Sequence, residues 1–504
     1  MPANTRHPDY ESALPNWLRA RDVLAGEDAV KAGGERYLPK LGSHTPDEYL
    51  AYKTRAAFFN ATARTADGFL GLIFRRDPSV KVPEGDSGVA RALADFCEDT
   101  DMQGTALTAY AKNVVSEVVG VGRAGTLVDW EEQGENRAYA VMYRAEQILN
   151  WRTERVSGVN IVTLVALHET VETGGDEFET ETVEQIRVLK LVGGEVAAVP
   201  GPDGERQPHY VVELWREVFE DGQQKRSSRA KRKLMLVETR IPLRLGRPLP
   251  AIPFVFHGAQ HALPPVEKLP LGDIITINLD HYRLDADYKH GLHFTALPTA
   301  WVSGFSKDSK LAIGSSTAWV TETIGATAGY LEFQGQGLQT FERAMDRDER
   351  LMAILGSRML EAQKRVGETA DAIELRQSGE NSVLSTLALS VSDGLTHVLR
   401  WVAWWNSTEA LPEDIGEDRV LVQLNTDFSN KGMASDELTA VVAAWQAGAI
   451  SRETMFDLFR RGEVLPAGRT DEEEARLTAG KPNAEARMPK AATFNNQQPT
   501  GNQQ

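Results

Sequence analysis

Apolar side chains recur at intervals of three and four residues along the first clearly helical segment of the sequence. In Thr45-Pro46-Asp47-Glu48, Thr45 can cap a helix, Pro46 suits its first position, and Glu48 stands where a capping box needs a carboxylate. The apolar stripe continues through Tyr49, Tyr52, Ala56, Phe59, Ala63, Ala66, Leu70 and Ile73. This spacing predicts one continuous helix that ends at Asp77-Pro78, and residues 105–119 predict a second helix.

After Ala124 the period of the pattern shortens to that of a strand. Segments rich in β-branched and aromatic residues follow one another, separated by glycine-containing pairs that favour hairpin turns. The segments are 126–130, 139–143, 160–165, 186–192, 210–216 and 234–245, and the pairs are Gly174-Gly175, Gly193-Gly194 and Asp221-Gly222. Together they predict an antiparallel β-domain.

Helical periodicity returns after a proline-rich hinge at residues 261–270. We expect one helix over residues 271–293, stopped by Leu297-Pro298, and a charged helix that begins near Thr340. The charged helix has an apolar stripe at Phe341, Met345, Met352, Leu355 and Met359, and an acidic row at Glu342, Asp346 and Glu349. The strand candidates between the two helices are 299–302, 318–321 and 330–333.

A break at Lys364-Arg365-Val366-Gly367 precedes another long helix, expected over residues 368–405. Its buried side is marked by Val383, Leu387, Val391, Leu395, Val398 and Val402. A strand at 419–424 and two short helices at 435–446 and 451–461 complete the pattern, and the residues after 481 lack core positions and are expected to be disordered. The whole order of elements predicts an α+β protein.

Composition narrows the class of protein. The net charge of −17 disfavours a protein that binds nucleic acid by neutralising phosphates. An acidic wall repels phosphate, which suits a conduit better than a clamp, and solubility through surface charge explains the value equally well. A single cysteine, Cys97, excludes an internal disulfide framework and fits assembly in a reducing cytoplasm. No apolar stretch is long enough to span a bilayer, and residues 1–21 lack the apolar core of an export signal.

Three motifs resemble chemical sites, and for each a purely structural role is better supported than a functional one. Gly120-Val121-Gly122-Arg123-Ala124-Gly125 matches a dinucleotide-binding pattern, but it joins a helix to a strand instead of a strand to a helix. Gly85-Asp86-Ser87-Gly88 matches a protease nucleophile motif, but Asp86 or Ser87 more simply caps the next helix. The potential metal ligands His281, Asp285, His290 and His293 are not all on one face of their helix.

A cationic segment follows the fifth predicted strand. Its six basic residues are Lys225, Arg226, Arg229, Lys231, Arg232 and Lys233. A solvated hairpin loop and a loop that contacts DNA both remain open, and the absence of interleaved aromatic residues argues against base stacking. No P-loop or zinc pattern occurs, so we expect no enzymatic activity, no cofactor and no metal.

Several segments taken in order resemble the portal family of podovirus- and siphovirus-type tailed bacteriophages. The N-terminal ones are Tyr37 to Leu41, Tyr49 to Asn60, Gly71 to Pro78 and Gly122 to Asp129. The later ones are Asp273 to His293 with Leu297-Pro298-Thr299, Gly367 to Ala372, Gly379 to Ser382, and Gly448 to Thr454. The resemblance covers about residues 30 to 470, and its order is more specific than any one motif.

The resemblance implies a portal fold and a virion location at one capsid vertex, after assembly in the host cytoplasm. It implies a homo-oligomeric ring, usually of twelve subunits, through which double-stranded DNA is packaged, retained and ejected. The implied partners are the terminase large subunit, head-completion or adaptor proteins, and the major capsid and scaffold proteins. The resemblance implies no membrane among the partners.

The resemblance also divides the chain into parts. These are a wing (1–264) with helical and antiparallel-β regions, a first stem helix (265–296), a clip (297–337), a second stem helix (338–362), a tunnel loop with a long helix (363–405), a returning wing strand (406–432), a crown (433–480) and a disordered tail (481–504). On this mapping the acidic row Glu342, Asp346 and Glu349 lines the channel, where weak adhesion of phosphate lets DNA slide. Lys364 and Arg365 then form a cationic ring near the DNA, although an ordinary solvated loop explains them equally well.

Two other classes of protein fit parts of the pattern. One is a different oligomeric virion component, such as a head–tail adaptor or a minor capsid protein. Adaptors are usually much shorter and lack a long helix–β–helix insertion. The other is a hydrolase or nucleotide-dependent enzyme, which the sequence motifs do not support.

Overall fold

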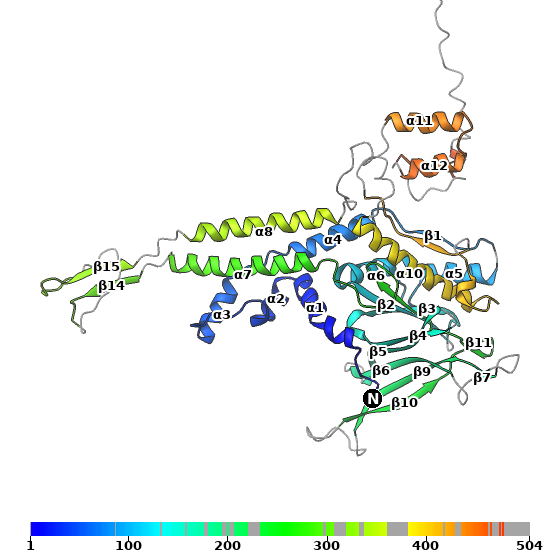
Figure 1. Cartoon of the computed structure of the whole chain (residues 1–504), viewed down its shortest axis with the longest axis horizontal. Helices are drawn as coiled ribbons and strands as arrows, with labels where there is room; N and C mark the ends of the chain where they lie inside the picture. The colour runs from blue at the N-terminus through cyan, green and yellow to red at the C-terminus, as the bar shows by residue number, and fades with distance from the viewer. Residues whose placement is uncertain are drawn as a thin grey trace, which may run out of the picture. The chain divides into compact units, whose positions relative to one another are not determined.

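The computed structural model divides the chain into two compact units, Met1–Phe428 and Ser429–Gln504. The residues that it describes are 2–85, 87–131, 134–156, 159–175, 180–193, 199–200, 206–219, 232–295, 299–306, 319–331, 337–359, 382–416, 419–428, 435–461, 464–465, 473–474 and 476–477. Helices and antiparallel sheets share the first unit, which confirms the predicted α+β class (Figure 1).

The N-terminal part of the first unit is helical. Its elements are α1 (Pro8–Ala25), α2 (Glu27–Ala32), η1 (Gly34–Arg36), α3 (Pro46–Arg55), α4 (Ala61–Ile73), α5 (Gly88–Glu98) and α6 (Leu107–Val121). The predicted capping box at the start of α3 is confirmed, because Thr45 accepts a hydrogen bond from the Glu48 backbone N–H and Glu48 accepts one from Thr45.

The prediction of one continuous helix from residue 45 to residue 77 is wrong. Residues 56–60 form no helix between α3 and α4, and Ala56 leaves the helical conformation with a φ of −59° and a ψ of 142°. The Ala57 N–H donates to the Asp285 carboxylate at 2.6 Å, and the Asn60 side chain caps α4. Contacts with a distant helix therefore break the helix that local periodicity predicts.

The strands in the described part of the chain pair in antiparallel fashion, which confirms the predicted antiparallel β-domain. A three-stranded sheet has the order β13-β2-β3, a five-stranded sheet has the order β10-β9-β6-β5-β4, and β1 pairs with β16. The bounds are β1 (Ser79–Lys81), β2 (Arg123–Trp130), β3 (Ala138–Arg144), η2 (Ala145–Gln147), β4 (Ile148–Val156), β5 (Val159–Gly175), β6 (Thr180–Val192), β7 (Val199–Pro200), β8 (Arg206–Gln207), β9 (His209–Phe219), β10 (Arg232–Arg240), β11 (Leu243–Arg244), β12 (Arg247–Pro248), β13 (Phe254–Gly258) and β16 (Leu421–Gln423).

Register in the five-stranded sheet places apolar residues opposite one another. Val165 lies opposite Leu189, which lies opposite Val212, and all three are buried. The strand predicted over residues 234–245 ends earlier, at Arg240. It is followed by Ile241-Pro242 and the small β11–β12 ribbon, because proline cannot donate to a sheet.

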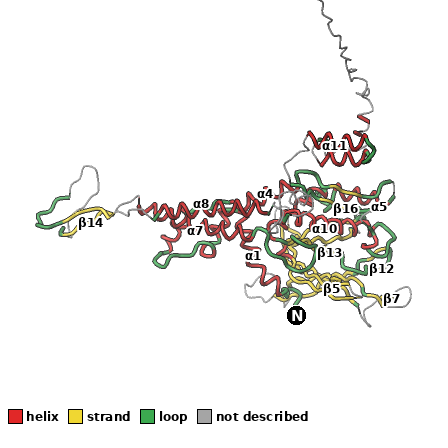
Figure 2. The backbone as a smooth tube through the Cα atoms, turned by 45° about the horizontal axis from the view of Figure 1, so that its top comes forward, coloured by secondary structure: helices red, strands yellow, loops and turns green. Residues whose placement is uncertain are grey.

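The buried centre of the first unit is α10 (Val383–Trp405), which ends beside η3 (Pro412–Asp414). It packs against β13, β16, α5 and α6, and its predicted apolar side is confirmed by the burial of Leu387, Val391, Leu395, Val398 and Val402, although Val383 is exposed. Figure 2 shows α10 beside the strands of the body. The predicted helix start at residue 368 and the break at 364–367 lie outside the described residues.

Two long helices form an antiparallel pair, α7 (Gly272–Thr295) and α8 (Leu338–Arg358). The β14 (Thr299–Ser303) and β15 (Thr327–Leu331) strands pair between them in sequence. The strand candidate at 318–321 is wrong over residues 319–321, which form a loop with Val320 84% exposed. The N-terminal half of α7 contacts α1 and α4, so the β14–β15 hairpin is attached at the other end of the pair (Figure 1).

The second unit contains a helical hairpin of α11 (Ser435–Gln446) and α12 (Arg452–Arg461), as predicted. Gly448 turns the chain with a φ of 73°, and the Ser451 side chain caps α12 by accepting from the Thr454 N–H. The tail predicted over residues 481–504 lies outside the described residues. No helix in the described parts is long and apolar enough to cross a membrane.

Candidate functional site

The best candidate for a functional surface is the α7–α8 pair, because its charged residues are regularly spaced. The predicted apolar stripe of α8 faces inward, with Met352 and Met359 buried and Phe341, Met345 and Leu355 partly buried. The far end of α8 also meets α4, where the position of a Cβ on Gly356 would lie 3.4 Å from Thr65.

The acidic row predicted to line a channel lies along the flank of α8 that borders α7. The Tyr288 hydroxyl donates to Glu342 Oε1 at 2.6 Å, and His281 Nε2 lies 3.4 Å from Glu349 Oε1. Asp346 lies between them, and its side chain is 63% exposed. The structure therefore brings Glu342, Asp346 and Glu349 into one row. Their predicted role in lining a channel stays a prediction.

The same helix carries an arginine row that was not predicted from the sequence. Arg343, Arg347 and Arg350 each follow one residue after a member of the acidic row, which places them about 100° further around the helix. All three side chains are exposed, Arg347 by 70% and Arg350 by 77%. The signal was present as three acid–arginine pairs, Glu342-Arg343, Asp346-Arg347 and Glu349-Arg350.

One carboxylate of α8 is buried in the pair. The Asp348 side chain is 3% exposed, and its Oδ2 atom has no hydrogen-bond partner among the described residues. Burial raises the pKa of Asp348, and the nearby Asp280 carboxylate raises it further. The helix pair therefore favours a protonated Asp348 more strongly than water does.

The four potential metal ligands on α7 do not converge. Asp285 accepts from the Ala57 N–H and pairs with Lys289 at 3.1 Å, whereas His281 is directed to Glu349. The ring of His290 packs edge-on against Tyr52. Within the described residues, no group of three histidine, cysteine or acidic side chains is placed to hold a metal ion.

The dinucleotide-like motif is the turn from α6 into β2, as the sequence analysis favoured. Gly122 ends α6 in the left-handed conformation with a φ of 77°, so the negative end of the helix dipole faces this turn. The Arg123 side chain is buried between Trp151 and Phe256 and donates to the Pro264 carbonyl at 2.6 Å. The motif therefore supports the hinge before α7.

The protease-like motif is a helix cap. Ser87 accepts a hydrogen bond from the Ala90 N–H at 3.2 Å and caps α5, which confirms the helix-capping role predicted for Ser87. Asp86 lies outside the described residues.

Most of the predicted cationic positions also lie outside the described residues. This holds for Lys225, Arg226, Arg229 and Lys231, and for Lys364 and Arg365. Arg232 and Lys233 begin the edge strand β10, where they pair with Phe219 and Val218, and Lys233 is exposed.

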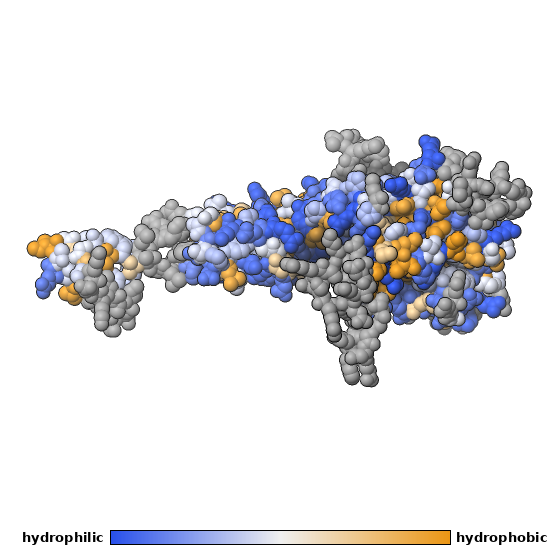
Figure 3. All heavy atoms as spheres, turned by 90° about the horizontal axis from the view of Figure 1, so that it is seen from below, coloured by the Kyte–Doolittle hydropathy of each residue, from blue (hydrophilic) through white to orange (hydrophobic). Residues whose placement is uncertain are grey.

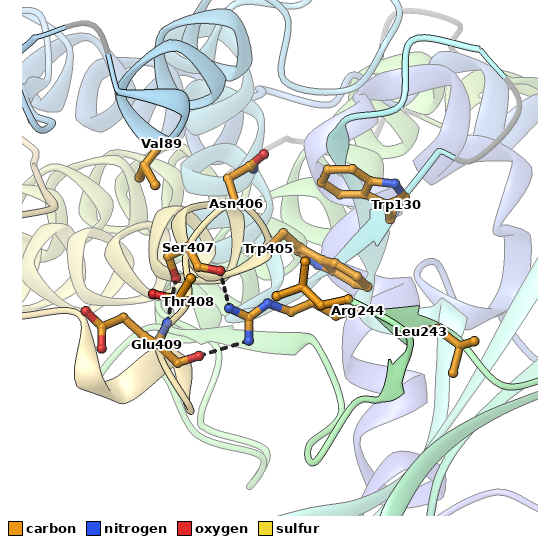
Figure 4. A pocket seen from close by; sticks show the side chains of 10 residues that line it. Val89, Trp130, Leu243, Arg244, Trp405, Asn406, Ser407, Thr408 and Glu409 are labelled. Carbon is orange, nitrogen blue, oxygen red and sulfur yellow. Dashed lines mark hydrogen bonds between the residues drawn. The ribbon is translucent and has the colours of Figure 1, made fainter.

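An open cleft of about 620 Å³ lies beside the end of α10 (Figure 4). Arg244 points into its wall, where it donates to the Ser407 carbonyl at 2.6 Å and the Glu409 carbonyl at 2.9 Å. The same guanidinium stacks on Trp404 at 3.8 Å, and burial lowers its pKa. Arg244 is thus committed to contacts within the chain.

A smaller hollow of about 310 Å³ lies between the two larger sheets. Glu169 accepts there from the Tyr143 hydroxyl at 2.5 Å and from Arg187 Nε at 2.7 Å. Arg187 also lies 3.6 Å from Asp129, whose pKa is raised by burial. Each charge has a partner of opposite charge, so this cluster joins the sheets.

Comparison with known proteins gives one family and several structures. Residues 270–406 match a family model described as a domain of unknown function, DUF4055, and this range spans α7, β14, β15, α8 and α10. No curated protein matches.

Three solved structures from gene transfer agent (GTA) particles are similar at 11% identity. The virion of a native GTA particle gives a TM-score of 0.36, with 86% of this chain and 98% of that chain covered. The neck of a native particle computed with C12 symmetry gives 0.35, with 79% and 89% covered, and the neck of an empty particle computed with C6 symmetry gives 0.37, with 86% and 98% covered. These scores assign neither a fold nor a function.

Proposed function

We propose that this chain is the subunit of a bacteriophage portal, a ring-shaped DNA channel at one vertex of the capsid. The observation that carries the proposal is the order α7, β14–β15, α8 and α10. Two long antiparallel helices with a small β-hairpin between them are followed by a long buried helix. This order is unusual for a globular enzyme, and it agrees with the stem, clip and long helix that the sequence resemblance implies.

Anchoring of α7 supports its role as a stem helix. Asn278 is fully buried, accepts from the Thr62 hydroxyl at 2.8 Å and donates to the Phe59 carbonyl at 2.7 Å. Further along, Asp287 accepts from the Tyr52 hydroxyl at 2.6 Å. These hydrogen bonds hold one side of α7 against the N-terminal helices and thereby fix the helix pair to the rest of the first unit.

The surface of the helix pair also suits a conduit. On the face drawn in Figure 3, hydrophilic residues cover most of the paired helices, whereas apolar residues gather on the body that bears the sheets. In the proposal, terminase and later head-completion proteins bind the β14–β15 end, and DNA passes along the ring axis.

Electron microscopy of the purified full-length chain tests the proposal. We expect rings with a central hole, and native mass spectrometry should give one closed oligomer. Monomers at high protein concentration, with or without scaffold and capsid protein, would overturn the proposal. A head–tail adaptor or minor capsid protein is the alternative, and a second measurement separates it. Heads assembled without this chain should contain no DNA if the chain is a portal, and DNA-filled heads would favour the alternative.

A further inference from the structure

The α8 helix carries two parallel rows of opposite charge at matching levels. The acidic row consists of Glu342, Asp346 and Glu349, and the arginine row consists of Arg343, Arg347 and Arg350. Each arginine is one residue after its acidic counterpart, so the members of a pair differ in height by only about 1.5 Å along the helix. The rows therefore form a ladder of three charge pairs that repeats every three to four residues.

Contacts within the chain leave most of these side chains exposed. Asp346 and Arg350 lie 4.0 Å apart, at the limit of an ion pair, and their side chains are 63% and 77% exposed. Arg347 is 70% exposed, and its ion-pair partner among the described residues is the buried Asp348, at 3.5 Å. Such pairs contribute little to the stability of one chain because water screens them.

Two exposed aliphatic residues lie on the arginine side of α8. Leu351 is four residues after Arg347, and Ile354 is four residues after Arg350, so each shares a face with an arginine. Leu351 is 38% exposed and Ile354 is 44% exposed. Arginine together with large apolar side chains is typical of protein interfaces, and DNA phosphates would gain nothing from the aliphatic groups.

We propose that α8 binds α8 of a second copy of this chain, with the acidic row of one copy against the arginine row of the next. The proposal rests on the proposed ring, and it adds the surface that closes it. If the ring axis is parallel to α8, rotation about it keeps each residue at the same level along the axis. The acidic row of one copy then meets the arginine row of its neighbour level by level, Glu342 with Arg343, Asp346 with Arg347 and Glu349 with Arg350. Because the two rows are on different flanks of one helix, the contact is head-to-tail and propagates around the ring.

This assignment changes the role that the sequence suggested for the acidic row. Glu342 and Glu349 already contact α7, at Tyr288 and His281. The row therefore serves contact between subunits instead of lining the lumen.

Charge reversal in two separate variants tests the interface in the full-length chain. The acidic-row variant is Glu342→Lys, Asp346→Lys and Glu349→Lys, and the arginine-row variant is Arg343→Glu, Arg347→Glu and Arg350→Glu. Each variant alone sets like charges against each other, so we expect both to remain monomeric at concentrations where the wild type forms rings. Mixed in equal amounts they should assemble, because every contact in a ring of alternating variants again joins opposite charges.

Native mass spectrometry reads the result directly, since the two variants differ in mass. Rings from either variant alone at the wild-type concentration, or no rings from the mixture, would overturn the interface while leaving the ring itself established. A wild type that stays monomeric would overturn both the ring and the interface. Thermal unfolding of each variant checks that it still folds. The single variant Asp346→Lys keeps the contacts of Glu342 and Glu349 with α7, and it should weaken assembly at least tenfold.

Binding of duplex DNA at low salt tests the alternative that DNA, and not a second copy of the chain, contacts the arginine row. If the arginine row faces DNA, the arginine-row variant should form rings and lose DNA binding, which would overturn the proposed contact between copies. We expect the opposite result, loss of rings that is restored by the partner variant.

Discussion

Gly394 of α10 lies directly against the ring of His257 on β13. A Cβ atom at position 394 would lie 2.9 Å from His257 Cε1 and closer still to Nδ1, which is tighter than packed atoms allow. His257 is fully buried, and its Nε2 atom lies 2.8 Å from the Thr126 hydroxyl, which holds the ring in place. The absence of a side chain at position 394 therefore sets the distance between the central helix and the three-stranded sheet.

Gly394→Ala should lower the free energy of unfolding by about 1–3 kcal/mol, because the methyl group forces α10 away from β13 or displaces the histidine. Gly71→Ala in α4 is the matched control. Beyond its two chain neighbours and the backbone of its own helix, no described atom lies within 4 Å of the added Cβ, so the exposed helical site should gain about 0.5–1 kcal/mol. Urea unfolding measures both changes. Equal effects at the two sites would contradict the close contact at Gly394.

Histidine 257 should make stability depend on pH. Burial lowers the pKa of His257 to about 3, so the folded chain keeps the ring neutral where the unfolded chain takes up a proton. The pKa is depressed in the folded state, so stability is full above about pH 6.5 and falls as the pH is lowered towards 3. This group should cost about 1.4 kcal/mol between pH 7.5 and pH 5.5. The His257→Gln variant should lack that part of the slope in urea unfolding at the two pH values, and an unchanged slope would contradict the assignment.

Arg123 should be required for the hinge before α7. Its guanidinium stacks on Trp151 at 4.2 Å and donates to the Pro264 carbonyl, and burial lowers its pKa to about 9. Arg123→Ala should cost about 2–4 kcal/mol and expose the hinge to proteases, since it removes both the stacking and the hydrogen bond. Arg152→Ala, on an exposed position of β4, should change stability by less than about 0.5 kcal/mol. Limited proteolysis with mass analysis locates the cut, and protection of the hinge in Arg123→Ala would argue against this role.

Asn278 should hold α7 against the start of α4. Asn278→Ala leaves the buried Thr62 hydroxyl and the Phe59 carbonyl without their partner, at a cost of about 2–3 kcal/mol. Hydrogen exchange should increase at residues 59–62 more than at α10. Thr276→Ala is the control, because its exposed hydroxyl bonds only within its own helix, to the Gly272 carbonyl. Uniform loss of protection in both variants would show that Asn278 has no local role.

The cationic pair Lys364-Arg365 remains a prediction from the sequence. Replacing both with alanine should reduce DNA packaging or retention, because a ring of subunits would lose two positive charges per copy near the DNA. Rings should still form, as electron microscopy can check. The amount of DNA per head is the deciding measurement, and wild-type packaging by the variant would remove the DNA-contact role.

Local patterns were enough to predict much of the fold. The capping box at Thr45, the buried side of α10 and the turn at Gly122 all follow from residues close together in sequence, and all are confirmed. The break between α3 and α4 could not be predicted in this way, because the Asp285 carboxylate that accepts from Ala57 is 228 residues away. Long-range hydrogen bonds overrode an apolar stripe that was otherwise regular.

In the candidate surface, too, some features follow from local sequence and others depend on long-range contacts. The acidic row on α8 could be recognised from its helical spacing, but its contacts with Tyr288 and His281 depend on how α7 lies beside it. The arginine row was equally visible in the sequence. It was overlooked because charged residues on an exposed helix face are ordinary, and only the inward direction of Met352 and Met359 reveals which charges remain outside.

The pairing of α7 with α8 restricts how the length of this helix pair can change in evolution or design. From His281 to Tyr288 the chain advances seven residues along α7, and the partners of these residues, Glu349 and Glu342, are seven residues apart in the opposite direction along α8. A seven-residue insertion in one helix alone would displace every later rung by about 10.5 Å. Matched insertions of seven residues in both helices would add one identical segment to each and leave the rungs aligned. Homologues with longer or shorter pairs should therefore differ by paired steps of two helical turns.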